Sequence, residues 1–311
     1  MDTGLIFGIL AAIMLAAGIV LIRKGSVRAG ESFTAVFISV VLGIPFFLIA
    51  VAFTGEWNKL WDISWQGIVL LGMGGIVHFI IGRYLNYGAF RLIGVNKGGT
   101  LINTSPFYAM ILAFIFLNEQ ITPLLVLGIA GIFAGAVLVG LEKKSVNVQT
   151  APADSPQKKR FSGTELKGIL AGLGGALCWG ISPVLIKPGV AEIGSAFTLS
   201  FVGPLVSYIA ATIAIASFLV RQQYRTQLSK LRFSRTLMFL FLGGMCIATG
   251  HMLNFTALSL SDASRVAPLI STSAIFMVIA SFLFDRKIEV FTLKVILGML
   301  ATVLGAFLIV N

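Results

Sequence analysis

The chain has 311 residues, of which 57% are hydrophobic and 11% are charged, and its mean hydropathy is +0.98. Soluble domains contain about 25% charged residues, so a soluble protein of this composition could not cover its surface with polar groups. The composition predicts an integral membrane protein. The net charge of +11 is explained by Lys and Arg in cytoplasmic loops, and no nucleic-acid partner is expected.

Ten apolar segments are long enough to cross a membrane, because a hydrocarbon core of ~30 Å needs about 20 helical residues. Backbone groups in lipid must be paired within their own segment, so each segment is predicted to be an α-helix. With approximate ends, the segments cover residues 4–22, 32–53, 66–88, 98–117, 123–141, 168–186, 196–220, 236–258, 264–284 and 291–310. The predicted fold is all-α, with ten transmembrane helices.

Two polar stretches interrupt this pattern. Trp57, Trp61 and Trp65 are spaced four apart, which fits either a short interfacial helix or a loop with aromatic anchors. Residues 142–167 are rich in Lys, Ser, Pro and Gln and are predicted to form a flexible polar linker. The linker would separate a first five-helix unit, 1–141, from a second one, 168–311.

The third predicted helix carries three polar side chains in an apolar run, His78, Arg83 and Asn86. Arg83 either binds an anionic group inside the bundle or extends to the cytoplasmic headgroups. His78 and Asn86 share a face that also carries glycines, because their spacing places them within an arc of about 80°. Such a face serves close helix packing or lines a polar cavity, and the sequence favours neither.

Polar triplets lie in the middle of the fourth and ninth predicted helices, as Asn103-Thr104-Ser105 and Ser271-Thr272-Ser273. Pro106 follows the first triplet and removes a backbone hydrogen bond, which frees a carbonyl that a substrate could use. The side chains of Asn103, Ser105, Ser271 and Ser273 are candidate substrate contacts. The alternative is that these side chains hydrogen-bond back to their own helices.

The sixth and eighth predicted helices supply the remaining candidates. Trp179 and Ser182 fit one wall of a binding site, although core packing is the more common role of a deep tryptophan. In the eighth helix, His251 and Asn254 occupy the positions that Arg83 and Asn86 occupy in the third. All twelve Asp and Glu residues lie outside the ten segments, so proton coupling would depend on the two histidines.

The stretch 82–119 recurs as 250–287 without a gap, which shows an internal repeat. Leu85-Asn86 corresponds to Leu253-Asn254, and the two polar triplets correspond to each other. Gly128 and Gly135 likewise recur with the same spacing as Gly298 and Gly305. Because five is odd, the second unit must enter the membrane from the opposite side, so the repeats are predicted to be inverted.

The positive charges test this topology. Loops that follow odd-numbered helices hold nineteen Lys and Arg residues, and those that follow even-numbered helices hold three. The positive-inside rule then places the odd loops in the cytoplasm and both termini outside it. The G-x-x-x-G pairs Gly4/Gly8, Gly131/Gly135 and Gly168/Gly172 are interpreted as packing within the monomer, with a homodimer as the alternative.

The sequence resembles the drug/metabolite transporter superfamily, in particular its members with two EamA-type domains, over nearly the whole chain outside the linker. The motifs that carry the resemblance are Trp179-Gly180, Asn86-Tyr87-Gly88-Ala89-Phe90, Asn254-Phe255-Thr256-Ala257-Leu258, Ser105-Pro106 and Phe116-Leu117-Asn118-Glu119. The chain departs from the family pattern at Leu15, Ala274 and Lys287, where a tryptophan, a proline and a glutamate are usual. The family is commonly drawn with cytoplasmic termini, whereas the charges here indicate the reverse.

The resemblance implies a transporter with a cavity between its repeats. We predict a secondary transporter that moves a small polar or anionic metabolite, such as an amino acid or a sugar, across the cytoplasmic membrane by alternating access. A multidrug exporter or a lipid-translocating protein on the same fold is the alternative. An intramembrane enzyme is a weaker alternative, because the spans hold two isolated histidines and no acid. An enzyme is not predicted, and no cofactor or metal is expected; the expected partners are a small-molecule substrate and membrane lipids. The candidate substrate-binding residues are His78, Arg83, Asn86, Asn103, Ser105, Trp179, Ser182, His251, Asn254, Ser271 and Ser273.

Overall fold

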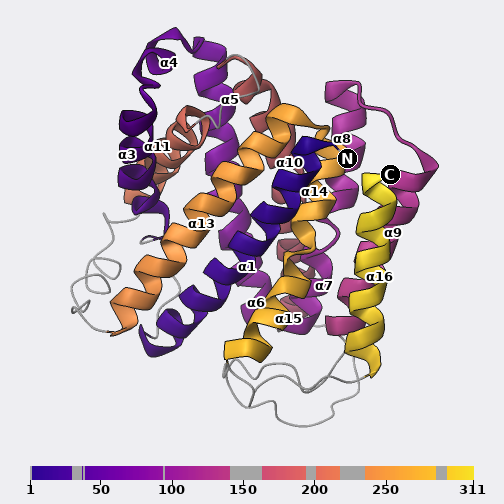
Figure 1. Ribbon diagram of the computed structural model, residues 1–311. Helices are drawn as coiled ribbons and strands as arrows, with labels where there is room; N and C mark the ends of the chain where they lie inside the picture. Colours follow the sequence, from indigo (N-terminus) through magenta and orange to yellow (C-terminus); the bar gives the residue numbers. More distant parts are fainter. Residues whose placement is uncertain are drawn as a thin grey trace.

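The computed structural model describes residues 2–29, 37, 39–93, 95–140, 163–193, 201–217, 235–284 and 293–311 (Figure 1). Within these ranges the regular elements are all helices, so the all-α prediction is confirmed for the described part of the chain. Five helical stretches are long and apolar enough to cross a membrane, and shorter apolar helices accompany them. The protein is a multi-pass membrane protein.

The helices of the first half are α1 (Thr3–Ala29), α3 (Gly43–Thr54), α4 (Trp57–Asp62), α5 (Trp65–Gly75), the π-helix η1 (Ile76–Gly82), α6 (Arg83–Ile93), α7 (Val95–Ile102), α8 (Ser105–Leu117) and α9 (Pro123–Gly140). Those of the second half are α10 (Gly163–Ala191), α11 (Val202–Ala216), α13 (Arg235–Leu260), α14 (Ala263–Ser271), α15 (Ser273–Phe284) and α16 (Leu293–Val310). Both termini lie at the end of the bundle that carries α4 (Figure 1).

Two predicted segments differ in detail from the structure, and two others lie only partly within the described ranges. Helix α10 begins at Gly163, so the last residues of the predicted linker are helical, and residues 142–162 lie outside the described ranges. The third predicted helix is one continuous run that changes from α to π geometry at η1. The two ends of the predicted helix at 196–220, residues 196–200 and 218–220, and residues 32–36 and 38 of the one at 32–53 lie outside the described ranges.

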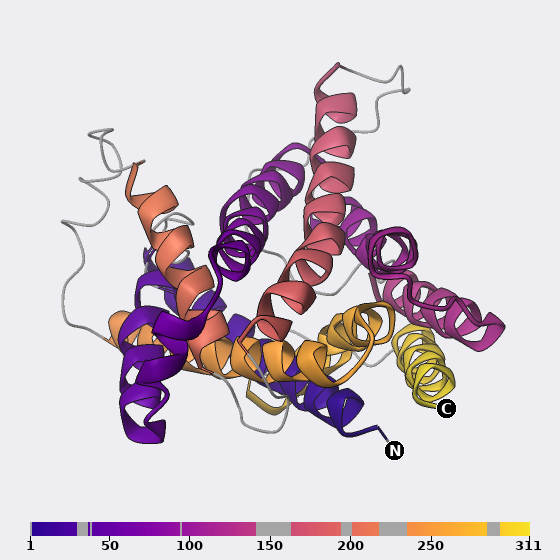
Figure 2. The same ribbon diagram turned by 90° about the horizontal axis from the view of Figure 1, so that it is seen from above.

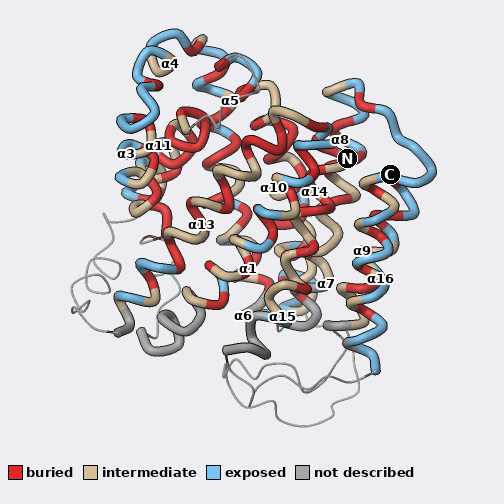
Figure 3. Tube along the Cα trace, viewed as in Figure 1, coloured by how far each residue is buried: buried red, intermediate tan, exposed pale blue. Residues whose placement is uncertain are grey.

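Large apolar side chains cover the outer surface of the bundle. Phe53, Ile213 and Leu304 are all more than 60% exposed. Figure 3 shows the buried residues concentrated in the central helices and the exposed ones along outer helices such as α9 and α16. An apolar exterior of this extent fits contact with lipid tails.

Helices of the two halves pack in matched antiparallel pairs. Helix α1 lies along α13, where the backbones approach closely at Gly18 and Gly243. Helix α10 lies in the same way along α5, η1 and α6, with Gly189 against Leu71 at one end and Gly168 against Ile93 at the other. In both cases a helix of one half packs along a helix of the other half.

The fifth helices of the two halves, α9 and α16, pair with each other at one edge of the bundle (Figures 1 and 2). A side chain at Gly131 would meet the backbone of Gly305 at 3.1 Å, so glycine allows this close approach. Gly135 lies in the same way against Gly298. These contacts confirm that the glycine pair 131/135 packs within the monomer; the homodimer alternative stays a prediction.

Both polar triplets interrupt their helices. Thr104 lies between α7 and α8, where its amide donates to the carbonyl of Leu101 at 3.1 Å and its hydroxyl donates to the same oxygen at 2.6 Å. Thr272 lies between α14 and α15 and makes the same two bonds to Leu269, also at 3.1 and 2.6 Å. Because the second break forms without a proline at position 274, the threonine turn and not Pro106 is common to the two breaks.

Candidate functional site

The side chains at the centre of the bundle form a compact aromatic and imidazole cluster. The ring of His78 stacks on that of Trp179, with centroids 5.7 Å apart and planes 17° apart. The same imidazole lies edge-on to His251, at a centroid distance of 5.3 Å. His78 comes from η1, Trp179 from α10 and His251 from α13, so both halves of the chain contribute. We call these three residues with Phe79, Ser182 and Tyr208 the central cluster.

His78 lies in the π-helix η1, and both its ring and its backbone carbonyl contact helix α10. A π turn alters the usual α-helical hydrogen bonding and is frequent at functional sites. The indole N–H of Trp179 donates to the carbonyl oxygen of His78 at 3.4 Å, and Nδ1 of His78 pairs with the hydroxyl of Ser182 at 3.1 Å. A Cβ at Gly82 would lie 2.8 Å from the indole ring, so this glycine allows Trp179 to approach.

His251 is held from two other elements. Its Nδ1 pairs with the hydroxyl of Tyr208, on α11, at 3.1 Å. Its ring also lies 4.7 Å from the ring of Phe79, which itself packs against Tyr208 at 4.7 Å. Both His251 and Tyr208 are buried, and a Cβ at Gly43 of α3 would collide with the Tyr208 ring. The packing therefore fixes the imidazole in one orientation.

Arg83 points into the bundle. Its guanidinium donates from Nη1 to the hydroxyl of Ser39 at 3.1 Å, and its Cζ lies 5.4 Å from the centre of the Phe79 ring. Ser39 is fully buried. The sequence left open whether Arg83 faces the inside of the bundle or extends to the headgroups. In this geometry the guanidinium faces inward and lies beside the central cluster.

Asn86 is buried between α6 and α10 with only 2% of its surface exposed. Neither its amide nitrogen nor its amide oxygen has a hydrogen-bond partner among the described residues. A side chain at Gly175 would collide with the amide oxygen, so the helices approach closely here. The close approach fits the packing interpretation, whereas the interhelical hydrogen bond expected with it is not made to any described residue, so the role of Asn86 stays a prediction.

Within the described residues, the remaining candidates make no hydrogen bond or ring contact with the central cluster. Ser271 donates to the carbonyl of Ala267 at 3.4 Å, which is the back-bonding expected as the alternative. Four others are half-buried and make no side-chain hydrogen bond to a described residue: Asn103, Ser105, Asn254 and Ser273. The structure therefore brings together His78, Arg83, Trp179, Ser182 and His251.

Sequence reasoning did not single out three residues of this region. Tyr208 and Phe79 lie in strongly apolar segments, and Ser39 is in a helix whose start lies outside the described residues. The tyrosine offered the clearest signal, since a buried phenol usually finds a hydrogen-bond partner. Phe79 offered none beyond its place next to His78.

A second polar network joins the two halves at the end of the bundle that carries α4 and the termini. Glu119, which follows α8, accepts hydrogen bonds from the backbone N–H groups of Ala263 and Ser264 and from Nζ of Lys187, each at 2.8 Å. Lys187 also reaches Asp262, at 3.1 Å. Burial raises the pKa of Glu119, but its hydrogen bonds with Lys187, Ser264 and Ala263 outweigh burial and lower the pKa below its ordinary value.

Two further contacts join the halves at the same end. The backbone N–H of Phe201, at the start of α11, donates to Glu56 at 3.0 Å. The hydroxyl of Ser64 donates to Glu192 at 2.8 Å. In the Glu56 and Glu119 contacts, an acid of the first half caps the N-terminus of a helix in the second half, where unpaired N–H groups attract anions.

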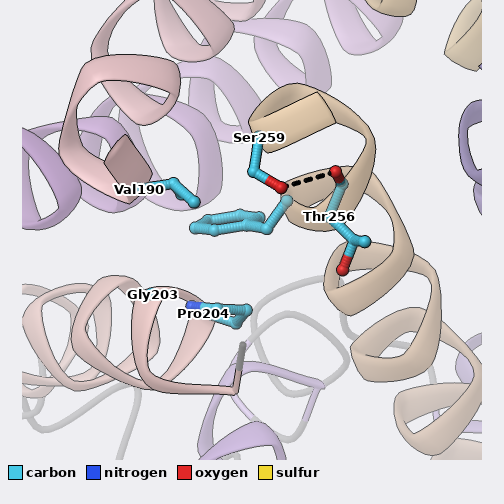
Figure 4. A pocket seen from close by; sticks show the side chains of 6 residues that line it. Val190, Gly203, Pro204, Thr256 and Ser259 are labelled. Atoms are coloured by element: carbon cyan, nitrogen blue, oxygen red, sulfur yellow. Dashed lines mark hydrogen bonds between the residues drawn. The ribbon is translucent and has the colours of Figure 1, made fainter. Parts of the chain in front are cut away.

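Two cavities lie outside the central cluster. One of about 10 Å³ lies between α10, α11 and α13, where Ser259 donates to the carbonyl of Thr256 at 2.8 Å (Figure 4). It has the volume of about one water molecule, so it is not a substrate site. The other, of about 380 Å³, is an open polar pocket beside Glu119 that is also lined by Gln120 and Arg265. Among the described residues no three His, Cys, Asp or Glu side chains lie close enough together to hold a metal ion.

A known protein family matches each half of the chain separately. The model of the EamA-like transporter family matches residues 2–141 and, again, residues 166–311. A crystal structure of a protein with 15% sequence identity superposes with a TM-score of 0.74, over 98% of this chain and 96% of that one. At this identity the likeness concerns the fold alone. No curated protein shows significant sequence similarity to the chain.

Proposed function

Because this chain belongs to the EamA-like transporter family, we propose that it is a secondary transporter that moves a small polar or anionic metabolite across the cytoplasmic membrane by alternating access. The observation that carries the proposal is the central cluster. Its imidazole, indole and hydroxyl groups come from both halves of the chain, and an inward-facing guanidinium, Arg83, lies beside it. A site shared by two halves changes its access when the halves move relative to each other.

The proposed architecture has ten transmembrane helices in two inverted five-helix repeats. The matched pairing of α1 with α13 and of α10 with the third helix of the first half supports it. So do the equivalent threonine breaks at Thr104 and Thr272. The proposed orientation, with both termini outside the cytoplasm, rests on the positive charges in the loops.

Alternating access requires that contacts between the halves form at one end and break at the other. The contacts made by Glu56, Glu119 and Glu192 all join the halves at the end that carries α4. They therefore support a state in which this end is closed. Opening it would separate Glu119 from the start of α14.

The test is solute flux in proteoliposomes that contain the purified protein. We expect uptake or exchange of at least one compound from a panel of amino acids, sugars and organic anions. For an anionic substrate, Arg83→Ala is expected to lower flux about tenfold or more, since a hydrogen bond to a charged group contributes about 1.5–3 kcal/mol. Tyr84→Phe is the matched control, because Tyr84 is the next residue and is largely exposed.

Two results would contradict the proposal. Absence of protein-dependent flux across the whole panel would contradict transport of a small metabolite. Full flux of an anionic substrate through Arg83→Ala would contradict the assigned role of the guanidinium. Flux of apolar cations or of labelled lipids in place of the panel would instead identify the alternative, a multidrug exporter or a lipid-translocating protein.

A further inference from the structure

The chain has two histidines, and the fold brings them into contact at the centre of the bundle. All twelve Asp and Glu residues lie outside the predicted spans, so no carboxylate there can carry a coupling proton. Histidine is the side chain that exchanges a proton most readily near neutral pH. We propose that His78 and His251 form a proton-binding pair that takes up a proton together with an anionic group of the substrate. This inference rests on the proposed transport function.

The hydrogen bonds of the pair allow a proton to be gained or lost without a broken contact. Nδ1 of His78 pairs with the hydroxyl of Ser182, and Nδ1 of His251 pairs with the hydroxyl of Tyr208, both at 3.1 Å. With the hydrogen of the neutral imidazole on Nδ1, this nitrogen donates to the hydroxyl oxygen in both charge states, and the added proton goes to Nε2. Neither Nε2 has a hydrogen-bond partner among the described residues, so these atoms remain for the proton and the substrate.

The charges around the pair explain why proton and anion would bind together. Among the described residues, four side chains make hydrogen bonds or ring contacts with the pair: Phe79, Trp179, Ser182 and Tyr208. Among them only Tyr208 is titratable, and Phe79 also contacts the permanently charged Arg83. No described carboxylate contacts either imidazole, so a proton on the pair would add a second cation without a counter-charge. A carboxylate or phosphate group would supply that counter-charge, and each ligand would then strengthen binding of the other.

The proton balance follows from this pairing. One proton from the solution adds to Nε2 of one imidazole when the anion binds, and it leaves when the anion is released on the other side. A singly charged anion that travels with one proton moves no net charge. Transport of a monocarboxylate is therefore expected to be insensitive to membrane potential and sensitive to the pH gradient.

The direct test uses nitrogen-15 histidine NMR on the whole protein in detergent, since the spectrum holds only these two residues. Benzoate and inorganic phosphate serve as probes. We expect at least one of the two anions to raise the ratio of protonated to neutral imidazole at pH 6 by about tenfold, the effect of one pH unit of coupling. His78→Gln and His251→Gln assign the signals. Arg83→Gln is expected to weaken the response, because the anion loses one of its partners.

A structural role for the pair predicts a different outcome. Two imidazoles that merely fill the core would show the same protonation with and without either anion, and that result would overturn the proposal. In proteoliposomes loaded with a pH indicator, any anionic panel compound that is transported should also change the internal pH. His251→Gln should lower the number of protons moved per molecule of substrate moved.

The outcomes separate this inference from the proposed function. Flux of an anionic compound without any change in internal pH would overturn the proposed proton-binding pair and leave the proposed transport function intact. Absence of flux for the whole panel counts against transport, while the NMR experiment still decides whether the pair binds a proton with an anion.

Discussion

Glu119 offers the sharpest test of how the two halves are held together. Helix α14 begins at Ala263, and its own N-cap residue, Asp262, makes no capping hydrogen bond. The carboxylate of Glu119 takes that role from the other half of the chain by accepting the N–H groups of Ala263 and Ser264, each at 2.8 Å. Substitution of Glu119 should therefore destabilise the protein more than substitution of Asp262.

The structure sets the size of this effect. Glu119→Ala leaves two backbone N–H groups without an acceptor, at about 1.5 kcal/mol each for bonds to a charged group, or about 3 kcal/mol in total. Glu119→Gln keeps an oxygen for one of them, so about 1.5 kcal/mol is expected. Because the Lys187 side chain is 26% exposed, its ion pair adds less than about 1 kcal/mol. Asp262→Asn, at a side chain that is 52% exposed, should change stability by less than about 0.5 kcal/mol.

The measurement is thermal unfolding of the purified variants in one detergent at pH 7. At about 2 °C per kcal/mol for a chain of this length, Glu119→Ala should lower the Tm by about 6 °C and Glu119→Gln by about 3 °C. Asp262→Asn is the matched control and should lie within about 1 °C of the wild type. Equal shifts for Glu119→Ala and Asp262→Asn would refute the capping role, as would a Glu119→Ala protein with an unchanged Tm.

Three further predictions follow from contacts described above. The pKa of Glu119 is lowered in the folded protein, so its carboxylate stabilises the fold above the ordinary pKa, and this effect is lost as the pH falls through the lowered pKa. The Tm difference between wild type and Glu119→Gln should therefore be constant from about pH 5 to 8 and shrink below about pH 4.5. Gly82→Ala should displace the Trp179 ring and reduce flux by about tenfold or more. The control is Gly88→Ala, whose Cβ would lie 4.0 Å from its nearest neighbour and which should leave flux unchanged. Equal flux through the two variants would contradict the role of Gly82. Asn86→Ala removes an amide that has no described partner, so the Tm should stay level or rise, and a fall of several degrees would indicate that the amide is paired.

The apolar segments and the repeat were sufficient to predict a helical membrane protein. Length and hydropathy locate spans because the bilayer requires continuous apolar helices. They do not report local changes in helix geometry. The π turn at η1 and the breaks at Thr104 and Thr272 depend on local hydrogen bonds and on neighbouring helices, which the apolar pattern does not encode.

For the central cluster, polar residues in apolar runs were an effective guide. His78, Trp179, Ser182 and His251 come together, with Arg83 beside them. The sequence could not show that Ser271 would bond to its own helix, since the spacing fits that role and a substrate contact equally well. Nor could it pair Glu119 with the start of α14, because that contact joins residues distant in sequence.

The capping contacts of Glu56 and Glu119 have a consequence for the resting state of the proposed transporter. Both acids belong to the first half, and at the position equivalent to Glu119 the second half has Lys287, a cation that cannot accept a hydrogen bond. In the proposed alternating access, opening the end that carries α4 would break these two capping contacts. An offset of about 3 kcal/mol would hold one state about a hundredfold more populated than the other. Solute gradients decide the direction of net flux, and these two carboxylates would decide which end stays shut while the protein waits for its substrate.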